Sequence, residues 1–170
     1  LFALSKLNEK EKFENIEPLL HKVLDDWTNR KKGEMLGLSS GFIDLDNILS
    51  GFQKSDFIVC AGRPSMGKTA LALKIARNIA IESKKSVGIF SLEMSSDQLA
   101  QRLLSSEARI DGQKARTGRL QAARWKDINT ASGKLADAPL FIDDTPALSI
   151  LDLRSRARRL KREENIELLI

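Results

Sequence analysis

The sequence contains one glycine- and lysine-bearing run at residues 62–69, which reads Gly62-Arg63-Pro64-Ser65-Met66-Gly67-Lys68-Thr69. It satisfies the pattern of a phosphate-binding loop, with an apolar run before it and a helical pattern after it. Backbone N–H groups of such a loop turn inward around phosphates, and the N-terminus of the following helix adds partial positive charge. A glycine turn that only caps a helix would not need Lys68 and Thr69 together. The run therefore predicts a nucleotide site, with Lys68 at the β- and γ-phosphates and the Thr69 hydroxyl as a Mg²⁺ ligand.

On both sides of this loop, short apolar runs alternate with longer helical patterns. The apolar runs predict strands at residues 57–61, 87–90, 140–142 and 168–170. The helical patterns cover residues 68–82, 96–108, 122–135 and 149–162. Strands that alternate with helices predict an α/β domain with a parallel sheet flanked by helices.

An amphipathic helix is predicted ahead of this domain, at residues 13–27. Its apolar residues recur at spacings of three and four, and Pro18 fits only in its first turn. Residues 29–34 are polar and contain a glycine, so they predict a linker. The pattern leaves open whether the helix packs on its own domain or on a neighbouring subunit. We expect two parts: a linker segment with this helix at 1–34, and the amino-terminal part of an ATPase domain at 35–170.

Glu93 follows the predicted strand at 87–90 and precedes the predicted helix at 96–108. A carboxylate just past a strand end can deprotonate a water for attack on a γ-phosphate. A carboxylate ahead of a helix can equally stabilise the helix dipole. The chemistry alone leaves these two interpretations comparable.

Composition excludes several classes of protein. The chain has 170 residues, and no apolar run approaches the roughly 20 residues of a membrane span, so no membrane partner is expected. Its single cysteine, Cys60, excludes a disulfide framework, fits a reducing cytoplasm, and is expected to be buried in a strand. The net charge is +5. The basic excess lies in residues 102–162, and we expect the arginine-rich helix at 149–162 to face solvent or another subunit.

Six motifs together resemble the replicative DNA helicases of the DnaB type. They are Gly41-Phe42-Ile43-Asp44-Leu45-Asp46, Gly51-Phe52-Gln53-Lys54-Ser55-Asp56, Ala61 to Thr69, Ser91-Leu92-Glu93-Met94-Ser95, Arg116-Thr117-Gly118 and Ile142-Asp143-Asp144-Thr145-Pro146. The Arg-Pro-Ser-Met insert and the Ser-Leu-Glu-Met box are much narrower signals than the general loop pattern. From the residues themselves, Asp143 and Asp144 predict a turn before Pro146, with a place near the nucleotide edge as the alternative.

The resemblance implies a RecA-like fold and a hexameric motor that hydrolyses ATP with Mg²⁺ to unwind duplex DNA at a replication fork. It implies that Glu93 activates the attacking water, and that the helix at 13–27 docks on the next subunit of a homo-hexamer. The partners it implies are single-stranded DNA, primase and a helicase loader. Two alternatives stay open: a RecA-like ATPase of recombination or repair, and an assembly module that binds ATP without hydrolysing it.

The two ends of the chain depart from that family. The first residue is Leu1, and Leu168-Leu169-Ile170 resembles the strand that leads into the second metal-organising motif. The acidic residue of that motif, the arginine supplied in trans and the DNA-contacting loops come later in the family. We therefore expect a piece of a larger motor, which alone binds nucleotide weakly and hydrolyses little.

Overall fold

The computed structural model describes residues 15–29, 35–117 and 119–170. The chain divides into two units, Leu1–Glu34 and Met35–Ile170. The assignment of a linker segment and an ATPase domain to these units stays a prediction. Residues 13 and 14 of the expected first helix, and 30–34 of the expected linker, lie outside the described residues.

The first unit contains one described helix, α1 (Ile16–Thr28). The Asn15 side chain accepts a hydrogen bond from the Glu17 N–H at 3.0 Å and caps the helix, and Pro18 falls in the first turn as predicted. The apolar face is exposed over its full length, at Ile16, Leu19, Leu20, Val23, Leu24 and Trp27.

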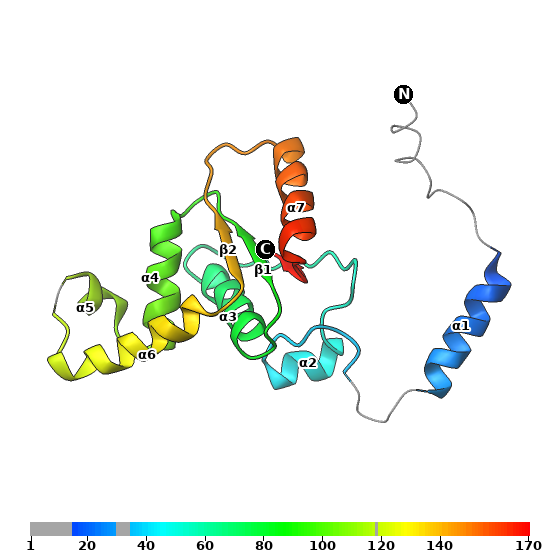
Figure 1. Ribbon diagram of the computed structural model, residues 1–170, viewed down its shortest axis with the longest axis horizontal. Coiled ribbons are helices and arrows are strands. Elements are labelled where there is room, and N and C mark those ends of the chain that lie inside the picture. Colours follow the sequence, from blue (N-terminus) through cyan, green and yellow to red (C-terminus); the bar gives the residue numbers. More distant parts are fainter. Residues whose placement is uncertain (1–14, 30–34, 118) are drawn as a thin grey trace. The chain divides into compact units, whose positions relative to one another are not determined.

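The second unit follows the alternation predicted from the sequence (Figure 1). Its elements are α2 (Ile43–Leu49), α3 (Lys68–Ile81), β1 (Val87–Phe90), α4 (Ser96–Glu107), α5 (Gly112–Arg116), the short 3₁₀ turn η2 (Ala122–Arg124), α6 (Trp125–Ala136), β2 (Leu140–Asp143), α7 (Ile150–Glu164) and β3 (Leu168–Leu169). The short helices α2 and α5 were not predicted. The longer elements agree with the predicted ranges to within a few residues, except at residues 57–61.

The three strands form a parallel sheet in the order β2-β1-β3, which confirms the predicted fold class. Val87 lies opposite Leu140 on one side of β1 and opposite Leu168 on the other. No helix in the described ranges is long and apolar enough to cross a bilayer.

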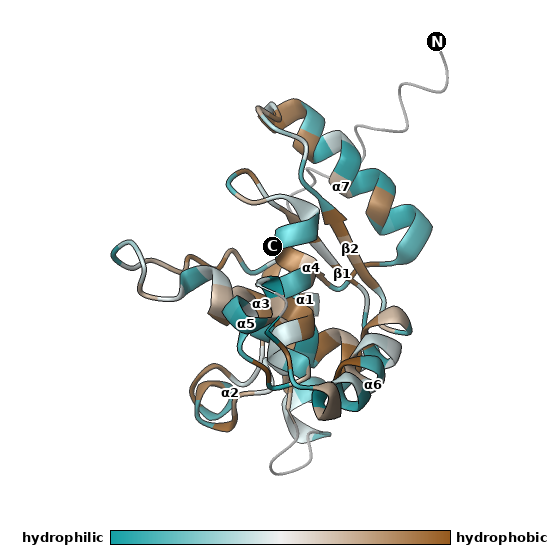
Figure 2. Ribbon diagram, turned by 90° about the vertical axis from the view of Figure 1, so that its left-hand side faces the viewer, coloured by the Kyte–Doolittle hydropathy of each residue, from teal (hydrophilic) through white to brown (hydrophobic). Residues whose placement is uncertain are grey.

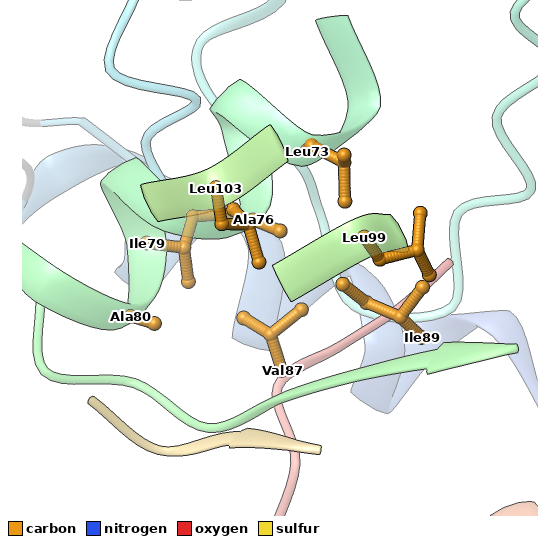
Figure 3. Packing of buried hydrophobic residues seen from close by; sticks show 8 residues of the cluster. All are labelled: Leu73, Ala76, Ile79, Ala80, Val87, Ile89, Leu99 and Leu103. Carbon is orange, nitrogen blue, oxygen red and sulfur yellow. The ribbon is translucent and has the colours of Figure 1, made fainter. Parts of the chain in front are cut away.

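The core lies between β1 and the helices α3 and α4 (Figure 3). Val87 and Ile89 point from one face of β1 toward α3 and α4, where Ile79 and Leu99 are buried against them. Gly88 points to the other face, where an added Cβ would lie 2.8 Å from Leu160 Cδ2 of α7. The sheet is therefore covered on both faces, and in Figure 2 its strands are mostly brown, whereas α7 carries much teal.

A charged network ties three helices around this core. Arg77 of α3 donates to Glu107 of α4 at 2.6 Å, and Lys134 of α6 lies 3.5 Å from the same carboxylate. The Glu107 side chain is only 6% exposed. The hydrogen bond from Arg77 lowers the pKa of Glu107, so this carboxylate stays ionised although it is largely removed from water.

The strand expected at residues 57–61 is wrong: this segment has no strand structure, and Phe57 is 92% exposed. Cys60, expected to be buried, is also exposed. A strand needs a neighbour to satisfy its N–H and C=O groups. The three described strands pair only with one another, and no described residue forms a ladder with this segment. Its high β-propensity alone therefore does not make it a strand.

Truncation of the fully buried Ile79 should destabilise the second unit. We expect Ile79→Ala to lower the free energy of unfolding by about 2–5 kcal/mol, since it removes three methyl or methylene groups from a packed site. Urea denaturation followed by circular dichroism measures this change. Ile48→Ala on α2 is the matched control, because Ile48 is 80% exposed. Equal changes in the two variants would contradict the position of the core.

Candidate nucleotide-binding site

Residues 62–67 form an exposed loop that runs directly into α3, whose first two residues are Lys68 and Thr69. Ser65 and Gly67 both adopt left-handed backbone conformations, with φ of +65° and +87°. A Cβ on Gly67 would meet nothing within 4 Å, so the backbone conformation rather than crowding requires glycine there. The two left-handed residues turn the loop back on itself ahead of the helix.

The N-terminus of α3 has no side-chain cap, because its N-cap residue is Gly67. By contrast, Ser95 caps α4 and Ser149 caps α7 through their hydroxyl groups. The first N–H groups of a helix have no partner within the helix. The loop therefore presents uncapped donors and the positive end of the helix dipole, which suits an anion such as a phosphate.

Lys68 and Thr69 occupy the first turn of α3. The Lys68 ammonium donates to the Gly62 carbonyl oxygen at 2.9 Å, across the mouth of the loop. Thr69 is half-buried. An ammonium on the loop and a hydroxyl beside it are the donor types that hold a nucleotide phosphate and its metal ion. The residues present thus fit a nucleotide with a divalent cation.

Glu93 lies in the loop between β1 and α4, where it is exposed. Because α3 packs along β1 and joins it through residues 82–86 only, the two run in opposite directions. The start of α3 and the carboxyl end of β1 therefore share one end of the sheet. The structure brings residues 62–69 and Glu93 to this common end, although no hydrogen bond in the described part of the chain joins them.

The N-terminus of α4 finds its acceptors elsewhere than on Glu93. The Ser95 hydroxyl accepts from the Gln98 N–H, and the Asp144 carboxylate accepts from the Ser96 N–H at 2.6 Å. This hydrogen bond lowers the pKa of Asp144. The start of α4 therefore needs no hydrogen-bond acceptor from Glu93, and stabilisation of its helix dipole by Glu93 stays a prediction.

Asp143 and Asp144 at the end of β2 are the site residues whose contacts the sequence did not predict. The Asp143 carboxylate accepts the Thr145 hydroxyl at 2.6 Å and the Arg156 guanidinium of α7 at 2.7 Å. It also accepts the Thr145 N–H, which agrees with the predicted turn. The hydrogen bonds from Thr145 and Arg156 lower the pKa of Asp143 to about 2. The one signal in the sequence that could have suggested these contacts is the position of Asp143 and Asp144 directly after the predicted strand at 140–142.

Among the described residues, no group of three or more His, Cys, Asp and Glu side chains could hold a metal ion by itself.

Comparison with known proteins places this geometry in context. A family model described as the DnaB-like helicase C terminal domain matches residues 37–170. The replicative DNA helicase DnaB of Geobacillus stearothermophilus is 41% identical over 172 residues, which cover 100% of the chain and 38% of that relative. The replicative DNA helicase DnaB of a Nostoc species is 52% identical over 132 residues, which cover 78% of the chain and 15% of that relative. The chain thus spans well under half of either relative.

Solved structures agree with these relatives. A structure described as an ATPase domain matches with a TM-score of 0.85 and 29% identity, over 93% of the chain and 56% of that domain. The structure of a DnaB-like replicative helicase, described with its interactions with primase, matches with a TM-score of 0.82 and 29% identity. The match covers 98% of the chain and 42% of the helicase chain.

The Asp143 carboxylate should titrate far below an ordinary aspartate. We expect Arg156→Ala to raise its pKa from about 2 toward the ordinary 3.8, with Thr145 still holding part of the shift. Because the folded-state pKa lies below the unfolded one, this contact stabilises the fold above about pH 4 and is lost as the pH falls through about 2. Carboxyl ¹³C shifts measured against pH report the titration. Arg159→Ala, on the same helix but paired with Glu163, is the control and should leave the Asp143 titration unchanged.

Proposed function

The chain belongs to the family of DnaB-like helicase C-terminal domains, and we propose that it supplies the nucleotide-binding part of an ATP-driven replicative DNA helicase. The observation that carries this proposal is the loop at 62–69, which opens onto the uncapped N-terminus of α3 at the same end of the sheet as Glu93. Unwinding at a replication fork is the activity that the relatives' names support.

Membership of this family supports the use of a nucleotide and a metal in general terms. We assign ATP and Mg²⁺. The backbone of residues 62–67 and the Lys68 ammonium would hold the phosphates, and the Thr69 hydroxyl would be a ligand of the ion. Mg²⁺ would neutralise charge that develops on the phosphate oxygens.

Glu93 is our candidate for the general base. Its carboxylate would take a proton from a water as that water attacks the γ-phosphorus, so that a bond forms to the incoming oxygen while the bond to the ADP oxygen breaks. Glu93 lies past the carboxyl end of β1, and the hydrogen bonds at the start of α4 are made by other residues, which supports this role.

The exposed face of α1 supports a homo-oligomer, which we propose to be a hexamer. Six large apolar side chains on one helix face need a partner, and a second copy of this chain is the occupant we assign. The second unit offers a cleft of about 760 Å³ between α3, α4 and α5, with apolar Leu73 and Met94 beside basic Lys74 and Arg102. Acidic Glu17 and Asp25 of α1 complement this charge, so we propose that α1 of one subunit enters the cleft of the next.

We further propose single-stranded DNA as the polymer on which the assembled motor acts, and a cytoplasmic location. Primase and a helicase loader are proposed partners of the whole protein. One solved relative is described with its interactions with primase, which supports the first of them.

Loss of the proposed base should abolish turnover while leaving nucleotide binding. In the complete protein with single-stranded DNA, we expect Glu93→Gln to lower kcat for ATP hydrolysis by about 10²–10⁴-fold, since a general base contributes that much. A coupled phosphate-release assay measures kcat, and a fluorescent ATP analogue measures binding. Asp97→Asn, an exposed acidic change in the first turn of α4, is the control. Unchanged turnover in Glu93→Gln would exclude the role of Glu93. Wild-type protein that binds ATP without hydrolysing it would support an assembly module instead.

A charge placed on the apolar face of α1 should weaken assembly. We expect Leu20→Asp to raise the concentration of half-assembly at least about tenfold, because burial of a leucine contributes about 1.5–3 kcal/mol. Light scattering or native mass spectrometry of the complete protein measures the hexamer fraction. Lys22→Asp places the same charge on the polar face and should preserve the hexamer. A normal hexamer in both variants would count against the docking of α1.

A further inference from the structure

Asp143, the last residue of β2, and Asp144, which follows it, form hydrogen bonds to the two ends of the loop that carries Glu93. At the first end, the Ser91 N–H donates to the Asp143 carbonyl oxygen at 2.9 Å. At the second, the Ser96 N–H donates to the Asp144 carboxylate at 2.6 Å. The loop that spans residues 91–96 is therefore anchored on a strand adjacent to its own.

Between these anchors, the loop is held by one serine. The Ser91 hydroxyl donates to the Met94 carbonyl at 2.6 Å and accepts the Met94 N–H at 3.2 Å. Leu92 and Glu93 form no backbone hydrogen bond to any other described residue. The position of Glu93 thus depends on the hydrogen bonds at the two ends of the loop, and the one to the Asp144 carboxylate is the shorter of the two.

The backbone next to Asp144 is held through its neighbour Asp143. The Asp143 carboxylate accepts hydrogen bonds from Thr145 and from Arg156 of α7, which join the end of β2 to a helix on the far face of the sheet. The Asp144 carboxylate extends from this held backbone to the Ser96 N–H. A displacement of about 1 Å in a catalytic group can cost about 10²-fold in rate, so a shift of this anchor would matter for Glu93.

We propose that Asp144 is a positioning residue, whose carboxylate holds the Ser96 N–H and thereby sets the place of Glu93 for proton transfer. This inference rests on the proposed function, in which Glu93 is the base. Among the described residues, Asp144 forms no hydrogen bond with residues 62–69, so its loss should act on the chemical step and not on nucleotide binding.

The test removes each side of this hydrogen bond in turn, in the complete protein with single-stranded DNA. Asp144→Ala removes the acceptor. Ser96→Pro removes the donor at a position where proline suits a helix, since Ser96 is the first residue of α4 and Ser95 before it is extended. Asp144→Asn keeps an oxygen acceptor. Asp152→Ala, which removes a carboxylate that accepts the Ser149 hydroxyl at 2.6 Å at the start of α7, is the control.

We expect Asp144→Ala and Ser96→Pro each to lower kcat by about 10- to 100-fold, with KM for ATP little changed. The double variant with both changes should have a kcat no lower than either single variant, because both remove the same hydrogen bond. Asp144→Asn should retain most of kcat, and the control all of it. Thermal unfolding shows that each variant is folded. Unchanged kcat in either single variant, additive losses in the double variant, or a rise in KM equal to the loss in kcat would overturn the inference.

The Glu93→Gln variant distinguishes failure of the positioning role of Asp144 from failure of the proposed function. If Glu93→Gln keeps its turnover, Glu93 is not the base and both proposals fall. If Glu93→Gln loses turnover while Asp144→Ala keeps it, the base stands and only the positioning role is overturned.

Discussion

The packing of α3 along β1 is the interaction on which the other parts of the second unit depend. Ile79 and Val87 are fully buried where these two elements meet. Because a short connection joins them, the packing makes them antiparallel, and the start of the helix returns to the carboxyl end of the strand. The loop at 62–67 and the loop that carries Glu93 thus come to one end of the sheet, although no hydrogen bond in the described part of the chain joins them. The core between α3 and β1 thus sets the relative positions of the two loops, and the loops carry the residues proposed for nucleotide binding and catalysis.

The starts of the helices differ in their hydrogen-bond partners. α4 and α7 start with serine caps, and α4 also receives a carboxylate from the neighbouring strand. α2, α3 and α6 start without a side-chain cap, and an uncapped start typically costs about 1 kcal/mol against a good cap. α3 is the one of these three that follows a loop with two left-handed residues and begins with a lysine, where an anion would supply the missing acceptor.

The sequence predicted the features whose cause is local. The loop at 62–69, the helix that follows it and the strand at 87–90 all carry their own pattern, and the structure confirms these elements. The segment 57–61 has an equally strong apolar pattern but forms no strand, because pairing depends on a neighbour that a pattern cannot specify. The contacts of Asp144 were missed for the same reason: Ser96 lies 48 residues away in sequence and becomes a neighbour only through the sheet. The roles of Lys68, Thr69 and Glu93 stay predictions.

The hydrogen bond between Lys68 and Gly62 holds the ammonium in place and leaves most of its donors available. An ammonium has three N–H donors, and the Gly62 carbonyl oxygen accepts one of them. A phosphate at the proposed site would therefore meet the full positive charge and two further donors without displacing the carbonyl oxygen. The contact also limits the rotamers of a long side chain before any ligand arrives, so less conformational entropy is left to lose on binding.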